Sequence, residues 1–85
     1  MDKIVVKKIN QKISETLSKK DEIREIVNLL NKEGMDKNSF SYGIVIGRLY
    51  NSFYYQTKRI LNRVPTNEEF DEFLKILKKH ESDFL

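Results

Sequence analysis

The chain has 85 residues, a formal net charge of +3, and neither cysteine nor tryptophan. A chain of this length forms one domain, residues 1–85, and we expect a stability of about 5 kcal/mol. Without cysteine there is no disulfide framework or thiolate metal site, so packing must stabilise the fold. The apolar runs are far shorter than the ~20 residues of a bilayer span, and the first residues lack the apolar core of a signal peptide. These features predict a soluble cytoplasmic protein with no membrane partner.

The charge is unevenly distributed along the chain. Residues 1–36 carry a net charge of +1, residues 37–64 carry +5 with no acidic side chain, and residues 65–85 carry −3. Twelve of the sixteen basic side chains are lysines, a bias that an AT-rich genome can produce without selection for binding. The total charge is therefore weak support for a nucleic-acid partner, and its concentration in the central segment is more informative.

The first apolar pattern has the spacing of a helix. One side of residues 3–17 collects Val5, Val6, Ile9, Ile13, Thr16 and Leu17. The run 4–6 alone could be a strand, but the later spacing favours a helix.

A second helix is predicted to follow almost at once. Ser18 lies three residues before Asp21, an arrangement that suits a helix N-cap. The apolar stripe of this helix consists of Ile23, Ile26, Val27 and Leu30. Gly34 is a natural C-terminal stop.

The segment after Gly34 is predicted to form a third helix of about 24 residues, beginning near Ser39 or Ser41. At about 100° per residue, an arc of about 140° centred on Ile46 contains its main apolar side chains. They are Leu49, Tyr50, Phe53, Tyr54, Thr57, Ile60, Leu61 and Val64. A strand is disfavoured, because no alternation of period two is sustained through these residues.

Two glycines lie inside this predicted helix. Gly43 and Gly47 each cost about 1 kcal/mol relative to alanine in a helix interior, so we expect them to allow a close helix crossing. In the alternative, residues 43–46 form an extended connector and the helix begins only after Gly47.

The clearest helix start in the chain follows Pro65. Thr66 can cap the helix, and Glu69, three residues later, completes a capping box. The first turns are acidic and the last turn is basic, which complements the helix dipole. The buried face is expected to consist of Phe70, Phe73, Leu74 and Leu77. The short link predicts a C-terminal helical hairpin and, with the other segments, an all-α bundle of about four helices.

The outward face of the third helix suggests a function. Three of the four arginines of the chain lie in the acid-free segment 37–64. Guanidinium groups make bidentate contacts with phosphate, and an exposed tyrosine can stack on a base. We therefore predict a DNA- or RNA-binding surface that consists of Arg48, Tyr55, Lys58, Arg59, Arg63, Lys3, Lys7 and Lys8. In the alternative, the face is only solvated, and its arginines pair with the acids at the start of the fourth helix.

A second hypothesis is an interaction or assembly module, with a protein partner or as a homodimer. Its candidate surface consists of apolar residues away from the main stripe of each helix: Ile44, Val45, Leu29, Ile76, Phe84 and Leu85.

We predict no catalytic or metal site. His80 is the only histidine, and the sequence supplies no partners for it as a catalyst or ligand. The acids at the start of the fourth helix, Glu68, Glu69, Asp71 and Glu72, are explained by helix capping. The aromatic residues Phe40, Tyr50, Phe53, Tyr54, Phe70 and Phe73 are expected in the core and not around a ligand. No phosphate loop, nucleophile elbow or zinc spacing is present, so we expect no enzyme, no cofactor and no small-molecule substrate.

Overall fold

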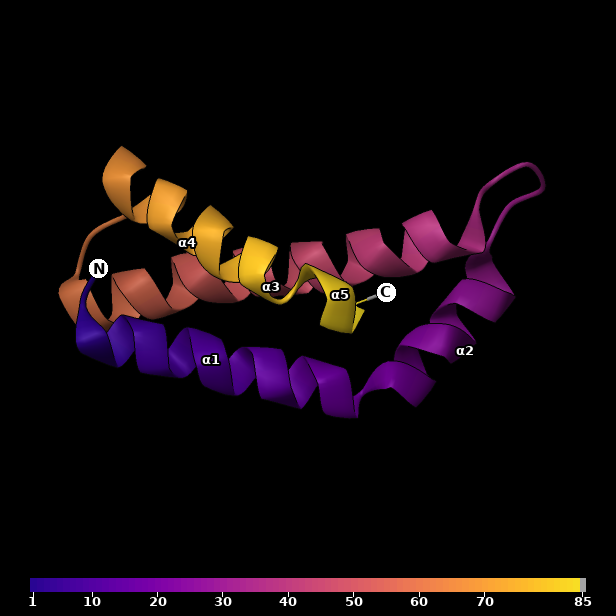
Figure 1. Cartoon of the computed structure of the whole chain (residues 1–85), viewed down its shortest axis with the longest axis horizontal. Coiled ribbons are helices and arrows are strands. Elements are labelled where there is room, and N and C mark those ends of the chain that lie inside the picture. Colours follow the sequence, from indigo (N-terminus) through magenta and orange to yellow (C-terminus); the bar gives the residue numbers. More distant parts are fainter. Residues whose placement is uncertain (85) are drawn as a thin grey trace.

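The computed structural model describes residues 1–84, which form five helices and no strand. The helices are α1 (Lys3–Ser18), α2 (Lys20–Leu30), α3 (Lys37–Leu61), α4 (Asn67–Lys79) and the short α5 (Glu81–Phe84). The predicted all-α fold with four main helices and a long third helix is confirmed (Figure 1).

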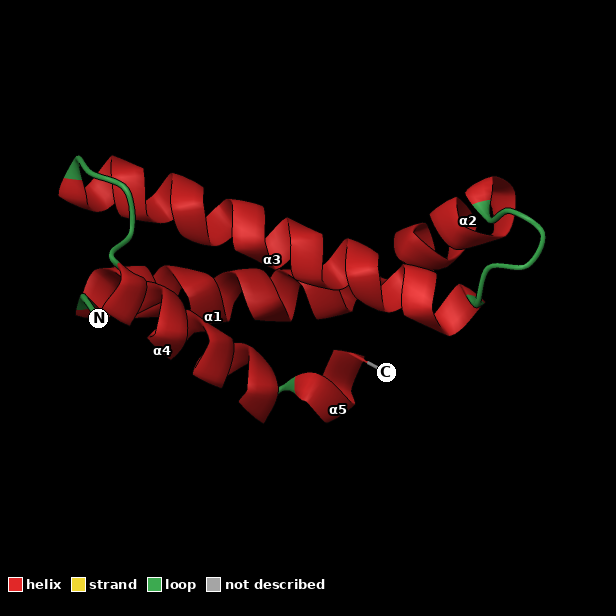
Figure 2. Cartoon of the chain, turned by 90° about the horizontal axis from the view of Figure 1, so that it is seen from above, coloured by secondary structure: helices red, strands yellow, loops and turns green. Residues whose placement is uncertain are grey.

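The helices α1 and α3 run antiparallel and side by side along most of the 41 Å length of the molecule (Figures 1 and 2). The helix α4 turns back from the end of α3 and lies over the α1–α3 pair, which confirms the predicted C-terminal hairpin. The helix α2 leaves the end of α1 at an angle and lies beside the first half of α3. The result is a three-helix bundle with α2 and α5 at one end.

The centre of the core is a stacked aromatic pair. The rings of Phe53 on α3 and Phe73 on α4 are 4.4 Å apart at an interplanar angle of 4°. Around them are the buried apolar side chains Val5, Ile9, Ile13, Ile23, Val27, Val45, Leu49, Leu77 and Phe84. Because two phenyl rings separate α3 from α4 at this point, side-chain stacking and not close backbone approach holds α4 in place.

The buried face of α3 is rotated from the predicted one. The residues that become buried are Val45, Leu49, Ser52, Phe53, Gln56 and Thr57. Tyr50, Tyr54 and Val64, which were predicted to be buried, are all more than a third exposed. The apolar arc of α3 is wider than the surface that α1 and α4 cover, so one edge of it stays in contact with water.

The helices α2 and α4 also bury narrower stripes than predicted. Of the predicted stripe of α2, Ile26 and Leu30 are exposed, and only Ile23 and Val27 are buried. On α4 the buried apolar residues are Phe73 and Leu77, while Phe70 and Leu74 are exposed. Both helices lie at the periphery of the bundle, where a helix contacts its neighbours along one narrow seam.

The boundary between α1 and α2 differs from the prediction. The helix α1 continues through Ser18, whose hydroxyl donates to the backbone carbonyl of Glu15 at 2.6 Å. Ser18 is therefore not an N-cap, and α2 begins after Lys19 without a side-chain cap. The helix α2 ends at Leu30, so Gly34 does not stop it directly but takes a left-handed conformation (φ 87°) in the loop that follows.

The start of α3 lies a few residues earlier than predicted. Asp36 caps it, because its carboxylate accepts from the backbone N–H of Asn38 at 3.1 Å and from the hydroxyl of Ser39 at 2.7 Å. These hydrogen bonds hold the pKa of Asp36 below its usual value. The helix ends at Leu61, about one turn before Val64.

The two glycines of α3 play a different part from the one predicted. Both lie within continuous helix, so the alternative of an extended connector is wrong. Both are exposed, and a Cβ built on Gly43 or Gly47 would meet nothing within 4 Å. Within residues 1–84, no other helix crosses α3 closely at Gly43 or Gly47, so the prediction of a close crossing is wrong.

Candidate nucleic-acid interface

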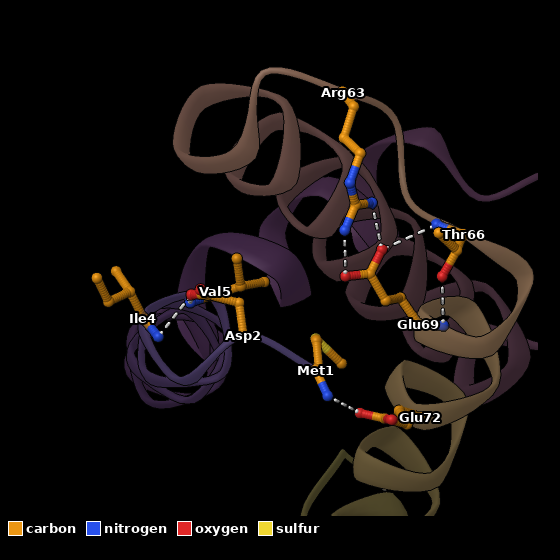
Figure 3. A network of polar contacts seen from close by, with 8 residues as sticks. All are labelled: Met1, Asp2, Ile4, Val5, Arg63, Thr66, Glu69 and Glu72. Carbon is orange, nitrogen blue, oxygen red and sulfur yellow. Dashed lines mark hydrogen bonds and ion pairs between the residues drawn. The ribbon is translucent and has the colours of Figure 1, made fainter.

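The corner between α3 and α4, residues 62–69, is a closed polar network (Figure 3). Thr66 and Glu69 form the predicted capping box: the hydroxyl of Thr66 accepts from the N–H of Glu69 at 3.1 Å, and the carboxylate of Glu69 accepts from the N–H of Thr66 at 2.9 Å. Arg63 donates to both oxygens of the same carboxylate, at 2.7 and 3.1 Å. The chain reaches this position because Asn62 ends α3 with a φ of 57°.

This network lowers the pKa of the Glu69 carboxyl. The guanidinium of Arg63, followed by the backbone N–H of Thr66, lowers the pKa of the Glu69 carboxyl to about 2. The same pair raises the pKa of Arg63. Arg63 was predicted to contact nucleic acid, but its guanidinium is engaged by Glu69, as the solvated-face alternative expects.

Arg48 has a weaker partner. Its Nη2 lies 3.5 Å from Oε1 of Glu15 on α1, and the other oxygen of that carboxylate lies 3.2 Å from Nζ of Lys12. All three side chains are at least one-third exposed, and exposed ion pairs of this length contribute little to stability. Arg48 can therefore leave Glu15 for a phosphate group at low cost.

Tyr55, Lys58 and Arg59 lie on the exposed side of α3. Tyr55 is 60% exposed, and neither Lys58 nor Arg59 makes an ion pair with any residue in 1–84. Arg59 is one helical turn after Tyr55, and Arg48 is two turns before it, so the three side chains form a line along α3.

One of the three predicted lysines of α1 joins this line. The Glu15–Arg48 ion pair fixes the register of the two antiparallel helices. Lys8 precedes Glu15 by seven residues and Tyr55 follows Arg48 by seven, so Lys8 lies alongside Tyr55 on the same flank. We call Lys8, Arg48, Tyr55, Lys58 and Arg59 the basic row.

The other two lysines of α1 point elsewhere. Helical geometry turns Lys7 about 100° and Lys3 about 140° away from Lys8. Both line a shallow hollow on another flank of α1, together with Asn10, Gln11 and Ser14. The structure therefore separates Lys3 and Lys7 from the basic row.

The residues predicted for a protein-association surface do not form one. Val45 and Phe84 are buried in the core, and Ile44 and Ile76 are partly buried against it. Leu29 is 81% exposed on α2. Leu85 lies outside the described residues. Val45 and Phe84 are covered because α2 and α5 pack over the end of the bundle, an arrangement that no local pattern indicates.

A different apolar surface spans neighbouring side chains of α3 and α4. Tyr50 packs edge-on against Tyr54, with centroids 5.4 Å apart, and against Phe70, with centroids 6.1 Å apart. Leu74 follows Phe70 by one turn of α4 and is 46% exposed. We call Tyr50, Tyr54, Phe70 and Leu74 the aromatic patch. The sequence predicted these side chains as core, and their partial exposure was missed.

Two kinds of feature are absent from residues 1–84. No group of three or more histidine, aspartate or glutamate side chains within residues 1–84 is placed to hold a metal ion. None of the helices in that range combines the length and the apolar character needed to cross a bilayer. Protein-family models, characterised proteins and solved structures were compared with the chain, and none matches.

Proposed function

We propose that the protein binds the sugar-phosphate backbone of a nucleic acid through the basic row. The observation that carries the proposal is the pair Tyr55 and Arg59, which lie one turn apart on exposed helix, with no acidic partner for Arg59 within residues 1–84. No acidic residue occurs anywhere in 37–64, so no negative side chain of α3 itself opposes a phosphate on this face.

The row suits a single strand better than a sequence-specific duplex contact. From Arg48 to Arg59 it extends about 16 Å along α3, enough for several consecutive phosphates. Tyr55 lies between the two arginines and can stack on a base that is splayed out of a strand. The four cations attract the phosphate backbone, and the aromatic ring stacks on a base. Both interactions are tolerant of the nucleic-acid sequence.

Fluorescence anisotropy with a labelled single strand and a labelled duplex, over a range of salt concentrations, tests the proposal. With four phosphate contacts, the slope of log K against log salt should be about −3 for the single strand. Arg59→Gln should weaken binding. It should also make the salt slope shallower by about 0.7, the value of one phosphate contact on a single strand. Tyr55→Ala should weaken single-strand binding about tenfold.

Arg24→Gln is the matched control, because it removes one exposed arginine on α2, away from the basic row. It should leave both the affinity and the slope close to those of the unchanged chain. The absence of binding at the lowest salt concentration, or an equal effect of Arg24→Gln and Arg59→Gln, would contradict the proposal.

The aromatic patch supports a second candidate function, the association of two copies of the chain. Gly43 and Gly47 lie on the same line of α3 as Tyr50 and Tyr54, at spacings of four, seven and eleven residues. The face is therefore flat at one end and aromatic at the other, and exposed apolar patches of this kind mark association surfaces.

Sedimentation velocity over a wide concentration range tests this second candidate. Leu74→Glu places a charge in the aromatic patch and should abolish association. Leu29→Glu places the same charge on α2 and should leave association intact. A chain that stays monomeric at every concentration contradicts this candidate without affecting the first.

A further inference from the structure

A cavity of 360 Å³ lies between the end of α1, the helix α2, the start of α3 and α5. Its size is at the lower end of the range of about 300–1,000 Å³ that is typical of small-molecule sites. Its floor is apolar and consists of core side chains from three helices: Ile23, Val27, Val45 and Phe84. The end of α1, the helix α2 and the start of α3, which line the cavity, lie away from the corner between α3 and α4 (Figure 1).

The rim of the cavity is positively charged. Lys20, Arg24 and Lys37 line it, and no acidic side chain does. Lys20 and Lys37 make no ion pair within residues 1–84, whereas Arg24 has an exposed contact of 3.2 Å with Asp21. Asp36, the nearest acid in sequence to Lys37, is engaged in capping α3. The cavity therefore presents an excess of positive charge.

One buried polar group also lines the cavity. Thr16 is 0% exposed, and its Oγ1 has no hydrogen-bond partner. Because this side chain is closed off from the cavity surface, it offers a ligand no hydrogen bond. The polar contacts available to a ligand beside the rim come from Ser41 and Asn38.

We propose that the cavity binds a small amphiphilic carboxylate. Its carboxylate group binds at the cationic rim formed by Lys20, Arg24 and Lys37, and its apolar body packs against Ile23, Val27 and Phe84. A bare inorganic anion would leave the apolar floor in contact with water, and a neutral hydrocarbon would leave the two lysines unpaired. Only a ligand with both parts matches both halves of the lining. None of these residues belongs to the basic row, so this proposal goes beyond nucleic-acid binding and stands independently of it.

Backbone amide NMR titration of the full chain with octanoate tests the proposal. Saturable shift changes are expected at Ile23, Val27 and Val45, and at the first residues of α3. Octanol, octylamine and inorganic phosphate are titrated in parallel, and each should bind at least about tenfold more weakly, since a charge-assisted contact is worth more than the ~1.4 kcal/mol that corresponds to tenfold. Equal binding of octanol and octanoate, or shifts confined to the aromatic patch, would overturn the proposal.

Two variants locate the site. Lys37→Gln should weaken octanoate binding about tenfold and leave octanol unchanged, while Lys75→Gln, which removes an equivalent charge on α4, should have no effect. Ser41→Phe fills the cavity and keeps the charges, so it should prevent octanoate binding altogether. If Ser41→Phe does not fold, the contrast between Lys37→Gln and Lys75→Gln still decides the question, and equal effects of those two variants would contradict the proposal.

Discussion

The corner between α3 and α4 and the region around α2 terminate the same bundle in different ways. At the corner, four hydrogen bonds join Arg63, Thr66 and Glu69, and the carboxylate is almost fully buried. At the other end, α2 begins after Lys19 without a side-chain cap, and Oδ1 of Asn31 is buried without a partner.

The apolar residues show a different contrast, between the centre of the core and the outer face of α2. Phe53 on α3 and Phe73 on α4 are almost completely buried. On α2, Leu29 and Leu30 are mostly exposed, and the cavity lies beneath the helix. The difference teaches that the corner between α3 and α4 is held by a closed hydrogen-bond network, whereas the α2 end has fewer polar contacts and a cavity beneath the helix.

The largest effect is expected from Phe73→Ala. Removing a buried phenyl ring costs about 3–5 kcal/mol, close to the whole stability of about 5 kcal/mol expected for this chain. Urea denaturation followed by circular dichroism should show a chain that is largely unfolded or barely stable. Leu30→Ala on α2 is the control and should change stability by less than about 0.5 kcal/mol. Similar losses in the two variants would remove the contrast between the core and the outer face of α2.

The next effect concerns Glu69. Glu69→Gln removes the charge from the corner network and should cost about 1–2 kcal/mol, because the carboxylate is buried but its partner Arg63 is nearly half exposed. The neighbouring substitution Glu68→Gln, at an exposed position, should cost much less.

The same carboxyl group predicts a pH dependence. The pKa of the Glu69 carboxyl is about 2 in the folded chain, against an ordinary value of 4.5. Its contribution to the free energy of unfolding is therefore complete above pH 4.5 and is lost as the pH falls toward 2. Unfolding free energies measured from pH 5 to pH 2 should fall more steeply for the unchanged chain than for Glu69→Gln. Parallel curves would show that the network does not act in solution.

A smaller, stabilising effect is expected from Gly43→Ala and Gly47→Ala. Each should add about 0.5–1 kcal/mol, because alanine is favoured over glycine in a helix and the space around both positions is open. Thermal unfolding measures the gain. A loss of stability in dilute solution would mean that a neighbouring group approaches these glycines more closely than in the structure described here.

The smallest effect is expected from Leu29→Lys. The side chain is 81% exposed, so its replacement should change the free energy of unfolding by less than about 0.5 kcal/mol. Urea denaturation checks this value. A loss above 1 kcal/mol would show that the α2 end is packed more closely than the exposure of Leu29 indicates.

The corner could be predicted from the sequence because its signals are local. Pro65, Thr66 and Glu69 lie within five residues of one another, and their hydrogen bonds depend on that spacing alone. Arg63 lies only six residues before Glu69, so their ion pair also depends on local spacing. The alternative in which the arginines of α3 pair with the acids at the start of α4 anticipated it.

The buried faces could be predicted only in part. Helical spacing identifies an apolar arc, but it does not tell which edge of the arc receives a neighbour, so Tyr50 and Phe70 were placed in the core. Ser18 and Asp21 had the spacing of a cap, but the apolar row of α1 continues to Leu17 and extends the helix through Ser18.

The cavity could not be predicted at all. Thr16, Lys20, Lys37 and Phe84 come from four helices, and only the packing of α2 and α5 brings them together. The basic row could be predicted in part. Helical spacing alone predicts the line of side chains on α3. The separation of Lys8 from Lys3 and Lys7 depends on the register of α1 against α3, which the sequence does not reveal.

The backbone of Asn62 limits which sequences can make this corner. Its φ of 57° is readily adopted by glycine and asparagine, and is strained for β-branched residues. A chain that turns in the same way is therefore expected to carry Gly, Asn or Asp at this position. The contact between Arg63 and Glu69 thus depends on one backbone torsion, and a valine in place of Asn62 would strain the turn that makes this contact possible.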